Sequence, residues 1–254
     1  MPTPPFPVGC CGFPKRRAVY YQHLPAVEVQ QTFYRPPRLE TAQRWRHEAP
    51  PDFVFTLKAW QLITHPPSSP TYRKANLRVD DPQAYGFFRP TRQVFEAWER
   101  TRAIAQALRA EAVLFQSPPS FRPTDENIAN MQRFFSHIER GPFLLAWEPR
   151  GEWTREQAVA LCQALDLALA LDPFEQEPPE GVPRYYRMHG QALGRGRYRY
   201  HYRYSDDELD RLVALTQARP PRFLFFNNSA MWEDARRFLA RWAAATASTK
   251  AGAA

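Results

Sequence analysis

The sequence predicts an α/β protein of the (β/α)8 class, the TIM barrel, and three observations lead to this prediction. Eight short apolar runs rich in β-forming residues recur along the 254 residues. Segments with helical periodicity separate most of these runs. The runs are apolar at nearly every position, which is typical of parallel strands covered on both faces. A doubly wound sheet is the alternative, but it often carries a glycine-rich first turn, and the sequence contains no GxGxxG.

The predicted elements alternate in order along the chain. The predicted strands cover residues 8–13, 26–33, 53–59, 112–118, 143–149, 167–174, 185–190 and 222–228. The predicted helices cover residues 38–49, 90–111, 123–140, 154–166, 205–219 and 232–247. Four of these helices begin beside a Ser or Thr whose side chain can cap the free backbone amides, namely Thr91, Thr124, Thr154 and Ser205.

Two segments interrupt the regular alternation. Residues 60–90 are too long and too rich in proline for a tight turn, which predicts an elaborated loop after the third strand. Residues 175–183, EQEPPEGVP, leave no room for a full helix after the sixth strand. Neither segment resembles a domain boundary. We therefore expect one barrel domain over residues 1–246 and a flexible tail over residues 247–254.

Composition limits the cellular setting and the partners. The net charge of +8 and the pI near 9.6 favour an anionic partner, such as a small phosphate or a nucleic acid. The three cysteines lack the paired spacing of a disulfide framework or a zinc site. No stretch is apolar enough to span a membrane, and the N-terminus lacks the pattern of a signal peptide. We expect a cytoplasmic protein without a membrane partner.

Polar side chains close nearly every predicted strand. In a (β/α)8 barrel the carboxyl ends of all strands meet at one mouth, where the active sites of such enzymes lie. Isolated charges are costly to bury, so their recurrence at strand ends points to a shared site. The residues at these ends are Glu28, Gln30, Lys58, Gln116, Glu148, Arg150, Asp172, Arg187, His189, Asn227 and Asn228.

Several motifs resemble the YecE-like family, also called domain of unknown function seventy-two. They are VGCCGF, VEVQQTFYRPP, FVFTLKAWQLITH, LFQSPPSF, AWEPRGEW, YYRMHG and FFNN, in the order of the family, over about residues 8 to 240. The resemblance implies a TIM barrel whose polar mouth could hold an active site. It does not imply a particular reaction. It assigns family motif positions to Glu28, Thr32, Phe33, Tyr34, Lys58, Thr64, His65, Gln116, Pro118, Glu148, Arg150, Trp153, Arg187, His189, Gly190 and Asn227.

The chain departs from the common family pattern at two places. Gln30 and Gln31 stand where many members have asparagine and serine, and Gly151 stands where many have histidine. These differences argue against any mechanism that needs a short amide at position 30 or an imidazole at position 151.

Four residues are the candidate catalytic groups. Glu28 or Glu148 can act as a general acid or base. Lys58 and His189 can assist proton transfer or stabilise negative charge, and a buried lysine can also act as a Schiff-base nucleophile. The alternative for Lys58 is a structural ion pair with Glu28 or Glu148.

The candidate substrate-binding residues are Gln30, Tyr34, His65, Gln116, Arg150, Asp172, Arg187 and Asn227. The guanidinium groups of Arg150 and Arg187 can bind a carboxylate or phosphate through two donors, can form internal ion pairs with Glu148 and Asp172, or can do both with different edges. His65 can serve as a base or as an anchor for the long loop.

No cofactor is predicted, and a divalent metal is left open. Glu28, Glu148, Asp172 and His189 could bind such an ion, but the cations in the same mouth oppose it. The sequence favours an enzyme, either a hydrolase, a lyase or an isomerase, that acts on a small anionic or polyhydroxylated substrate. The alternative is nucleic-acid binding, or metal-assisted phosphodiester hydrolysis like that of barrel endonucleases, through the basic and aromatic tract 194–205. The substrate and oligomeric state are not predicted.

Overall fold

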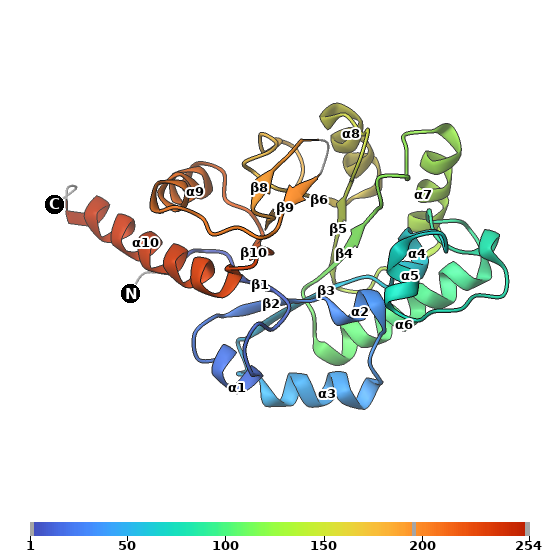
Figure 1. Cartoon of the computed structure of the whole chain (residues 1–254), viewed down its shortest axis with the longest axis horizontal. Helices are drawn as coiled ribbons and strands as arrows, with labels where there is room; N and C mark the ends of the chain where they lie inside the picture. The colour runs from blue at the N-terminus through green and yellow to red at the C-terminus, as the bar shows by residue number, and fades with distance from the viewer. Residues whose placement is uncertain (1–2, 195–196, 252–254) are drawn as a thin grey trace.

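The computed structural model describes residues 3–194 and 197–251, and the side chains up to residue 247. Eight parallel strands close into a barrel in the order β1-β10-β7-β6-β5-β4-β3-β2. Figure 1 shows the strands at the centre and the helices around them. The predicted (β/α)8 barrel is confirmed, and an open doubly wound sheet is ruled out by the pairing of β1 with β10.

The barrel strands are short, with four or five residues each. They are β1 (Val8–Cys11), β2 (Ala26–Val29), β3 (Val54–Lys58), β4 (Ala112–Gln116), β5 (Leu144–Glu148), β6 (Ala168–Leu171), β7 (Arg184–Met188) and β10 (Phe223–Phe226). Most end before the predicted limit. The run predicted as a strand over residues 26–33 is interrupted at Gln30, whose backbone is helical and begins the short helix α2 (Gln31–Tyr34).

The longer helices pack around the outside of the barrel. They are α3 (Leu39–Glu48), α6 (Arg92–Leu108), α7 (Asp125–His137), α8 (Arg155–Leu165), α9 (Asp206–Ala218) and α10 (Met231–Ala251). The four predicted caps are confirmed because each hydroxyl accepts a backbone amide, and Thr154 and Ser205 form complete capping boxes. The helix α10 continues through residues 247–251, where a tail was expected, and residues 252–254 lie outside the described part.

The interior of the barrel changes from apolar to polar along the strands. Side chains two residues apart share a face of a strand, so each strand gives small or aromatic groups below and a polar group above. The lower interior is a buried cluster that includes Ala146, Tyr185 and Phe225. Gly9 is required there, because a Cβ at this position would lie 1.9 Å from the carbonyl oxygen of Ala26.

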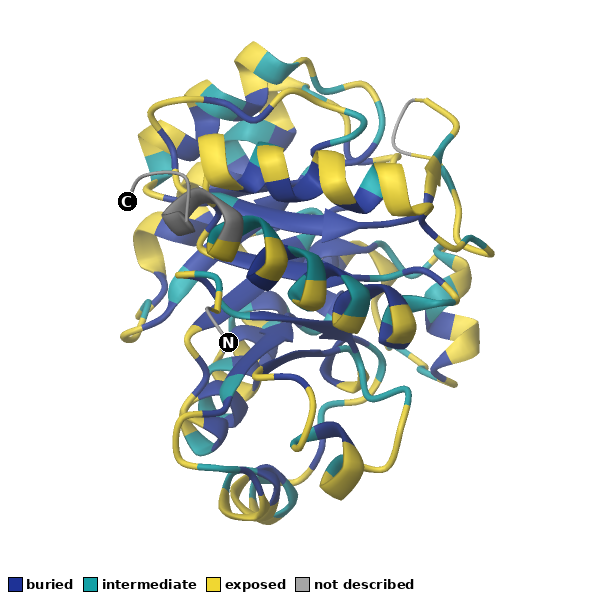
Figure 2. Ribbon diagram, turned by 90° about the vertical axis from the view of Figure 1, so that its left-hand side faces the viewer, coloured by how far each residue is buried: buried dark blue, intermediate teal, exposed yellow. Residues whose placement is uncertain are grey.

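A second, larger apolar layer lies between the strands and the helices. Figure 2 shows buried strands at the centre and helices whose outer faces are exposed. Trp98 of α6 and Trp147 of β5 are completely buried in this layer. Burying such large rings provides much of the driving force for folding. The layer fixes the strands, and therefore the positions of the side chains at their ends.

The two predicted irregularities are confirmed. The long connection after β3 contains α4 (Gln61–Thr64), α5 (Pro70–Lys74) and a 3-10 turn η1 (Pro82–Ala84). Residues 172–183, all of which are described, contain no helix between β6 and β7. The chain also forms a helix α1 (Arg17–Tyr20) and a hairpin, β8 (Gln191–Ala192) with β9 (Tyr198–Arg199), that were not predicted. In the part of the chain that the structure describes, no helix has the length and apolarity to cross a membrane.

Candidate functional site

The centre of the mouth, which is the end of the barrel at the strand carboxyl termini, is occupied by Arg187. Its Nη2 donates to Oε1 of Glu28 at 2.8 Å, and its Nη1 donates to Oε2 of Glu148. All three side chains are buried, with exposed fractions of 1% for Arg187 and 4% or less for the carboxylates. The guanidinium therefore neutralises two carboxylates from different strands, and we call these three residues the Arg187 cluster.

A second guanidinium also binds Glu148. Arg150 lies two residues beyond the end of β5, and its Nε donates to Oε1 of Glu148 at 2.5 Å. Burial alone would raise the pKa of Glu148, but Arg150 and Arg187 hold it well below its usual range. Glu148 is consequently an anion at neutral pH, and its role in the structure is to orient two arginines. Glu148 and Asp172 were the ion-pair partners expected for Arg150 and Arg187. Both arginines pair with Glu148, and neither forms an ion pair with Asp172.

Three residues that were not predicted complete the cluster. Tyr185 donates its hydroxyl to Oε2 of Glu28 at 2.7 Å and lies 2.8 Å from the Thr56 hydroxyl. The Cys11 thiol donates to Oε1 of Glu28 at 3.2 Å. Tyr185 precedes Arg187 by two residues on β7, so the period of a strand could have placed it on the same face.

Lys58 is the mouth cation that a carboxylate does not neutralise. Its Nζ donates to Oε1 of Gln116 at 3.0 Å and lies 3.7 Å from the centre of the Phe33 ring. It forms no ion pair with a carboxylate of residues 3–194 or 197–247, so the expected pairing with Glu28 or Glu148 is not formed. Burial, followed by the charge of Arg187, lowers the pKa of Lys58 to about 7. Near neutral pH this amine exists in both protonation states.

His189 follows β7, and its Nε2 lies 3.4 Å from Oε1 of Glu148. Its Nε2 lies 3.0 Å from Nη2 of Arg150, and its Nδ1 lies 3.0 Å from the side-chain amide of Asn227. The ring of Tyr198, from the hairpin, packs against the imidazole with centroids 4.5 Å apart. Burial lowers the pKa of His189 to about 3, so the ring is neutral.

Asp172 holds the backbone after β6 rather than forming an ion pair with Arg150 or Arg187. Its Oδ1 accepts the amide of Phe174 at 3.0 Å, and its Oδ2 accepts the amide of His189 at 2.9 Å. Burial raises the pKa of Asp172 to about 7, against the lowering effect of these two amides. The carboxyl group connects the loop after β6 to the end of β7, and it thereby fixes the position of the His189 backbone.

The remaining predicted residues lie at the edge of the mouth. Gln30 donates its amide to Oε1 of Glu28. Tyr34 is half-buried and faces Lys74, whose Nζ is 4.9 Å from the ring centre. His65 is bonded through Nδ1 to the Thr64 hydroxyl at 2.8 Å, and burial lowers its pKa to about 3.

The basic and aromatic tract 194–205 uses most of its described rings inside the fold. Tyr198 lies 4.7 Å below the Arg150 guanidinium and donates to Glu175, and Tyr204 is buried. Tyr200 is the exception, with 44% of its surface exposed. Residues 195–196 of this tract lie outside the described part. The tract therefore forms one wall of the mouth. It offers few exposed rings on which nucleic-acid bases could stack.

Within the described residues, no group of three or more His, Cys, Asp and Glu side chains is placed to hold a metal ion. The carboxylates nearest to such a role are occupied by Arg187 and Arg150. Glu28 and Glu148 therefore bind arginine side chains, which occupy the oxygens that a metal ion would need.

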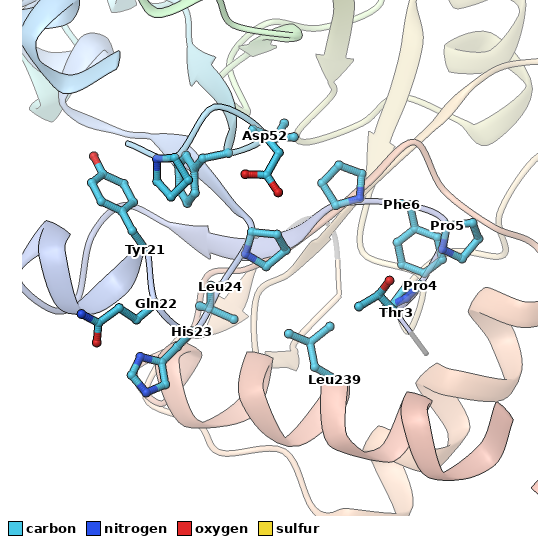
Figure 3. Close-up of a pocket in the computed structure, with 15 residues that line it drawn as sticks. Thr3, Pro4, Pro5, Phe6, Tyr21, Gln22, His23, Leu24, Asp52 and Leu239 are labelled. Carbon is cyan, nitrogen blue, oxygen red and sulfur yellow. The ribbon is translucent and has the colours of Figure 1, made fainter. Parts of the chain in front are cut away.

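One cavity lies at the opposite end of the barrel. It has a volume of about 680 Å³ and is lined by residues at the amino ends of β1, β2 and β3 and by Leu239 of α10. Figure 3 shows Tyr21, Asp52 and the proline-rich segment from Thr3 around it. None of the predicted site residues lines this cavity. In barrels of this class that end of the strands contributes to stability.

Comparison with known proteins gives a family and a fold. A DUF72 family protein of Enterococcus faecalis V583 has a TM-score of 0.69 and 20% identity, over 93% of this chain and 95% of that one. A DUF72 family protein of Thermotoga maritima MSB8 has a TM-score of 0.62 and 23% identity, over 92% and 97% of the two chains.

Beyond that family the similarity concerns the fold alone. A D-psicose 3-epimerase, solved in the presence of D-fructose, has a TM-score of 0.56 and 12% identity, over 92% of this chain and 97% of that one. No curated protein matches the chain. The model of the family described as "Protein of unknown function DUF72" matches residues 6–253, and the chain therefore belongs to the DUF72 family.

Proposed function

We propose that the mouth is the active site of an enzyme that uses Lys58 to transfer protons on a small anionic substrate. The observation that carries this proposal is the environment of the Lys58 amine. It is buried, its pKa is lowered to about 7, and its hydrogen-bond partner is the neutral amide of Gln116. An acid or base works best when its pKa lies near the working pH.

The charge of the mouth supports an anionic substrate. Glu28 and Glu148 are matched by the two guanidinium groups of Arg187 and Arg150. When Lys58 and Asp172 are both protonated, the mouth therefore carries an excess positive charge. An anion such as a phosphorylated or carboxylated sugar would offset it, and the amides of the mouth could bind its hydroxyl groups.

The neutral Lys58 amine would accept a proton from the substrate, and the resulting ammonium would return it at another atom. This cycle suits an isomerase or a lyase. Arg150 would orient the anion or stabilise developing negative charge from its place beside His189. Glu28, Glu148 and Arg187 would act as positioning residues, because their charged atoms are already bound to one another.

A hydrogen-exchange screen tests the proposal without knowledge of the product. The protein is incubated in D2O with a panel of phosphorylated and carboxylated sugars, and loss of substrate C–H signals is followed by proton NMR. We expect exchange for at least one class of compound with the wild type. The Lys58→Met variant should lose this exchange at least a hundredfold, consistent with the usual contribution of a general acid or base.

Lys74 provides a matched control because it is an exposed lysine that contacts Tyr34 at the edge of the mouth and is not among the groups around the Lys58 amine. The Lys74→Met variant should exchange like the wild type. Borohydride treatment with each substrate distinguishes a covalent Schiff base, which gives a mass increase at Lys58, from proton transfer alone. Exchange that persists in Lys58→Met, or no exchange with any compound, would overturn the proposal.

Nucleic-acid binding has less support. The tyrosines at 198 and 204 are used inside the fold, and the carboxylates needed for a metal are bound to arginines. A steep fall of affinity for single-stranded DNA with increasing salt would favour this alternative.

A further inference from the structure

A cavity of about 340 Å³ lies beside the mouth and is lined by residues from α1, α2 and α3 and from the ends of β1 and β2. Figure 1 shows these three helices on the same side of the barrel. It is separate from the Arg187 cluster but shares one residue with the mouth, Gln30. Its lining residues are Gly12, Phe13, Lys15, Arg16, Arg17, Val29, Gln30, Gln31 and Trp45.

The lining carries three positive charges and no negative one. Arg17 is already engaged, because its Nε donates to Oε2 of Glu48 at 2.8 Å and its guanidinium lies 5.5 Å from the Trp45 ring centre. Lys15 and Arg16 are exposed and form no ion pair or hydrogen bond through their side chains with the described residues. Two cations at this cavity are therefore available to an external anion.

Amide groups border the same cavity. Gln31 is exposed at the first position of α2, and Gln30 precedes it. The Gln30 amide nitrogen donates to Oε1 of Glu28, which in turn accepts from Arg187. An anion beside Gln30 would therefore lie one side chain away from the Arg187 cluster.

We infer that this cavity binds a phosphate group, with Lys15 and Arg16 as its ligands and Gln30 as the link to the mouth. A phosphate dianion matches the two available cations, and ammonium and guanidinium groups are the usual protein ligands of phosphate. The inference rests on the proposed function, because it assigns the phosphorylated end of the substrate to this cavity. If the cavity binds phosphate, the substrate of the proposed enzyme is a phosphorylated compound rather than a simple carboxylate.

Inorganic phosphate is the probe for the test. It is titrated into 15N-labelled protein at constant ionic strength, with acetate as a parallel titration. We expect saturable shifts of the backbone amides of Gly12, Lys15 and Gln31, and weaker binding of acetate. The Lys15→Gln/Arg16→Gln variant should bind phosphate at least tenfold more weakly.

The control variant removes the same charge from another face of the molecule. Arg92→Gln/Arg133→Gln changes two exposed arginines on α6 and α7 and should bind phosphate like the wild type. Equal weakening in both double variants would mean a general charge effect and would overturn the inference. So would shifts confined to other parts of the chain, or acetate binding as tight as that of phosphate.

The variant Lys58→Met separates this inference from the proposed function. Phosphate binding should be unchanged in that variant because Lys58 does not line the cavity. If phosphate binds at Lys15 and Arg16 while Lys58 proves dispensable, the phosphate site stands and the proposed chemistry fails. If Lys58 is required but phosphate does not bind, the chemistry stands and this inference fails.

Discussion

Arg187 reaches across the interior of the barrel to Glu28, with 2.8 Å between Nη2 and Oε1. The two residues lie on β7 and β2, which are not neighbours, since β7 pairs with β6 and β10 and β2 pairs with β1 and β3. The same guanidinium binds Glu148 on β5. One side chain therefore connects three strands at the mouth, and its loss would leave the buried carboxylate of Glu28 without its cation, while Glu148 keeps Arg150.

The variant Arg187→Met should be strongly destabilised. Breaking a buried ion pair by removing one partner costs about 3–5 kcal/mol, because the remaining charge stays buried. Urea unfolding followed by circular dichroism measures the change in the free energy of unfolding.

Two further variants make this prediction specific. Glu148 keeps its ion pair with Arg150, so the double variant Arg187→Met/Glu28→Gln removes the carboxylate that loses its cation, and part of the lost stability should return. Arg241→Met breaks half-exposed pairs with Asp206 and Asp210 and should cost about 1 kcal/mol or less. An Arg187→Met protein as stable as Arg241→Met would show that the cluster is not required for the fold.

The Lys58→Met variant should be more stable than the wild type at pH 6. The folded protein lowers the pKa of Lys58 from 10.5 to about 7. Between pH 7 and pH 10.5 the unfolded chain therefore keeps a proton on this lysine that the folded chain has released. Wild-type stability from this group therefore rises as pH increases from 7 to 10.5, and is lowest below pH 7. The expected gain at pH 6 is on the order of 3–5 kcal/mol, at about 1.4 kcal/mol per pKa unit.

Urea unfolding at several pH values between 6 and 10 tests this linkage. The difference between Lys58→Met and the wild type should shrink toward pH 10. The control Lys74→Met removes an exposed lysine and should change the free energy of unfolding by about 0.5 kcal/mol or less. A constant difference at all pH values would mean that packing, rather than the charge of Lys58, controls its effect on stability.

The Asp172→Asn variant should lose one of the two backbone contacts that Asp172 makes. Both carboxyl oxygens accept a backbone amide, from Phe174 and from His189, and asparagine offers only one oxygen. The amide left without an acceptor is expected to cost about 1–3 kcal/mol. Amide hydrogen exchange should be faster at Phe174 or His189 in this variant, and unchanged protection at both positions would contradict the assigned contacts.

The Gly9→Ala variant tests the packing of the barrel itself. Its Cβ would lie 1.9 Å from the carbonyl oxygen of Ala26, so strands β1 and β2 must separate. Overpacking of this kind typically costs about 1–3 kcal/mol. Thermal unfolding measures the loss. A Gly9→Ala protein as stable as the wild type would contradict this steric argument.

Local features of the fold were predictable because they depend on neighbouring residues. The capping boxes that begin at Thr154 and Ser205 each depend on four consecutive residues, and both form as expected. The long connection after β3 and the missing helix after β6 follow from proline content and length. The end of β2 was misplaced because the residues from Gln30 to Phe33 suit a strand or a helix, and packing decides between them.

The sequence by itself determined the barrel and the set of polar residues at its mouth, because strand periodicity and the strand–helix alternation are local properties. Only the tertiary structure decided how these residues pair. Arg187 binds Glu28 and Glu148 rather than Asp172, and Lys58 contacts Gln116 and Phe33. These choices depend on barrel closure, which brings together residues far apart in the chain, and on burial, which makes each unpaired charge costly.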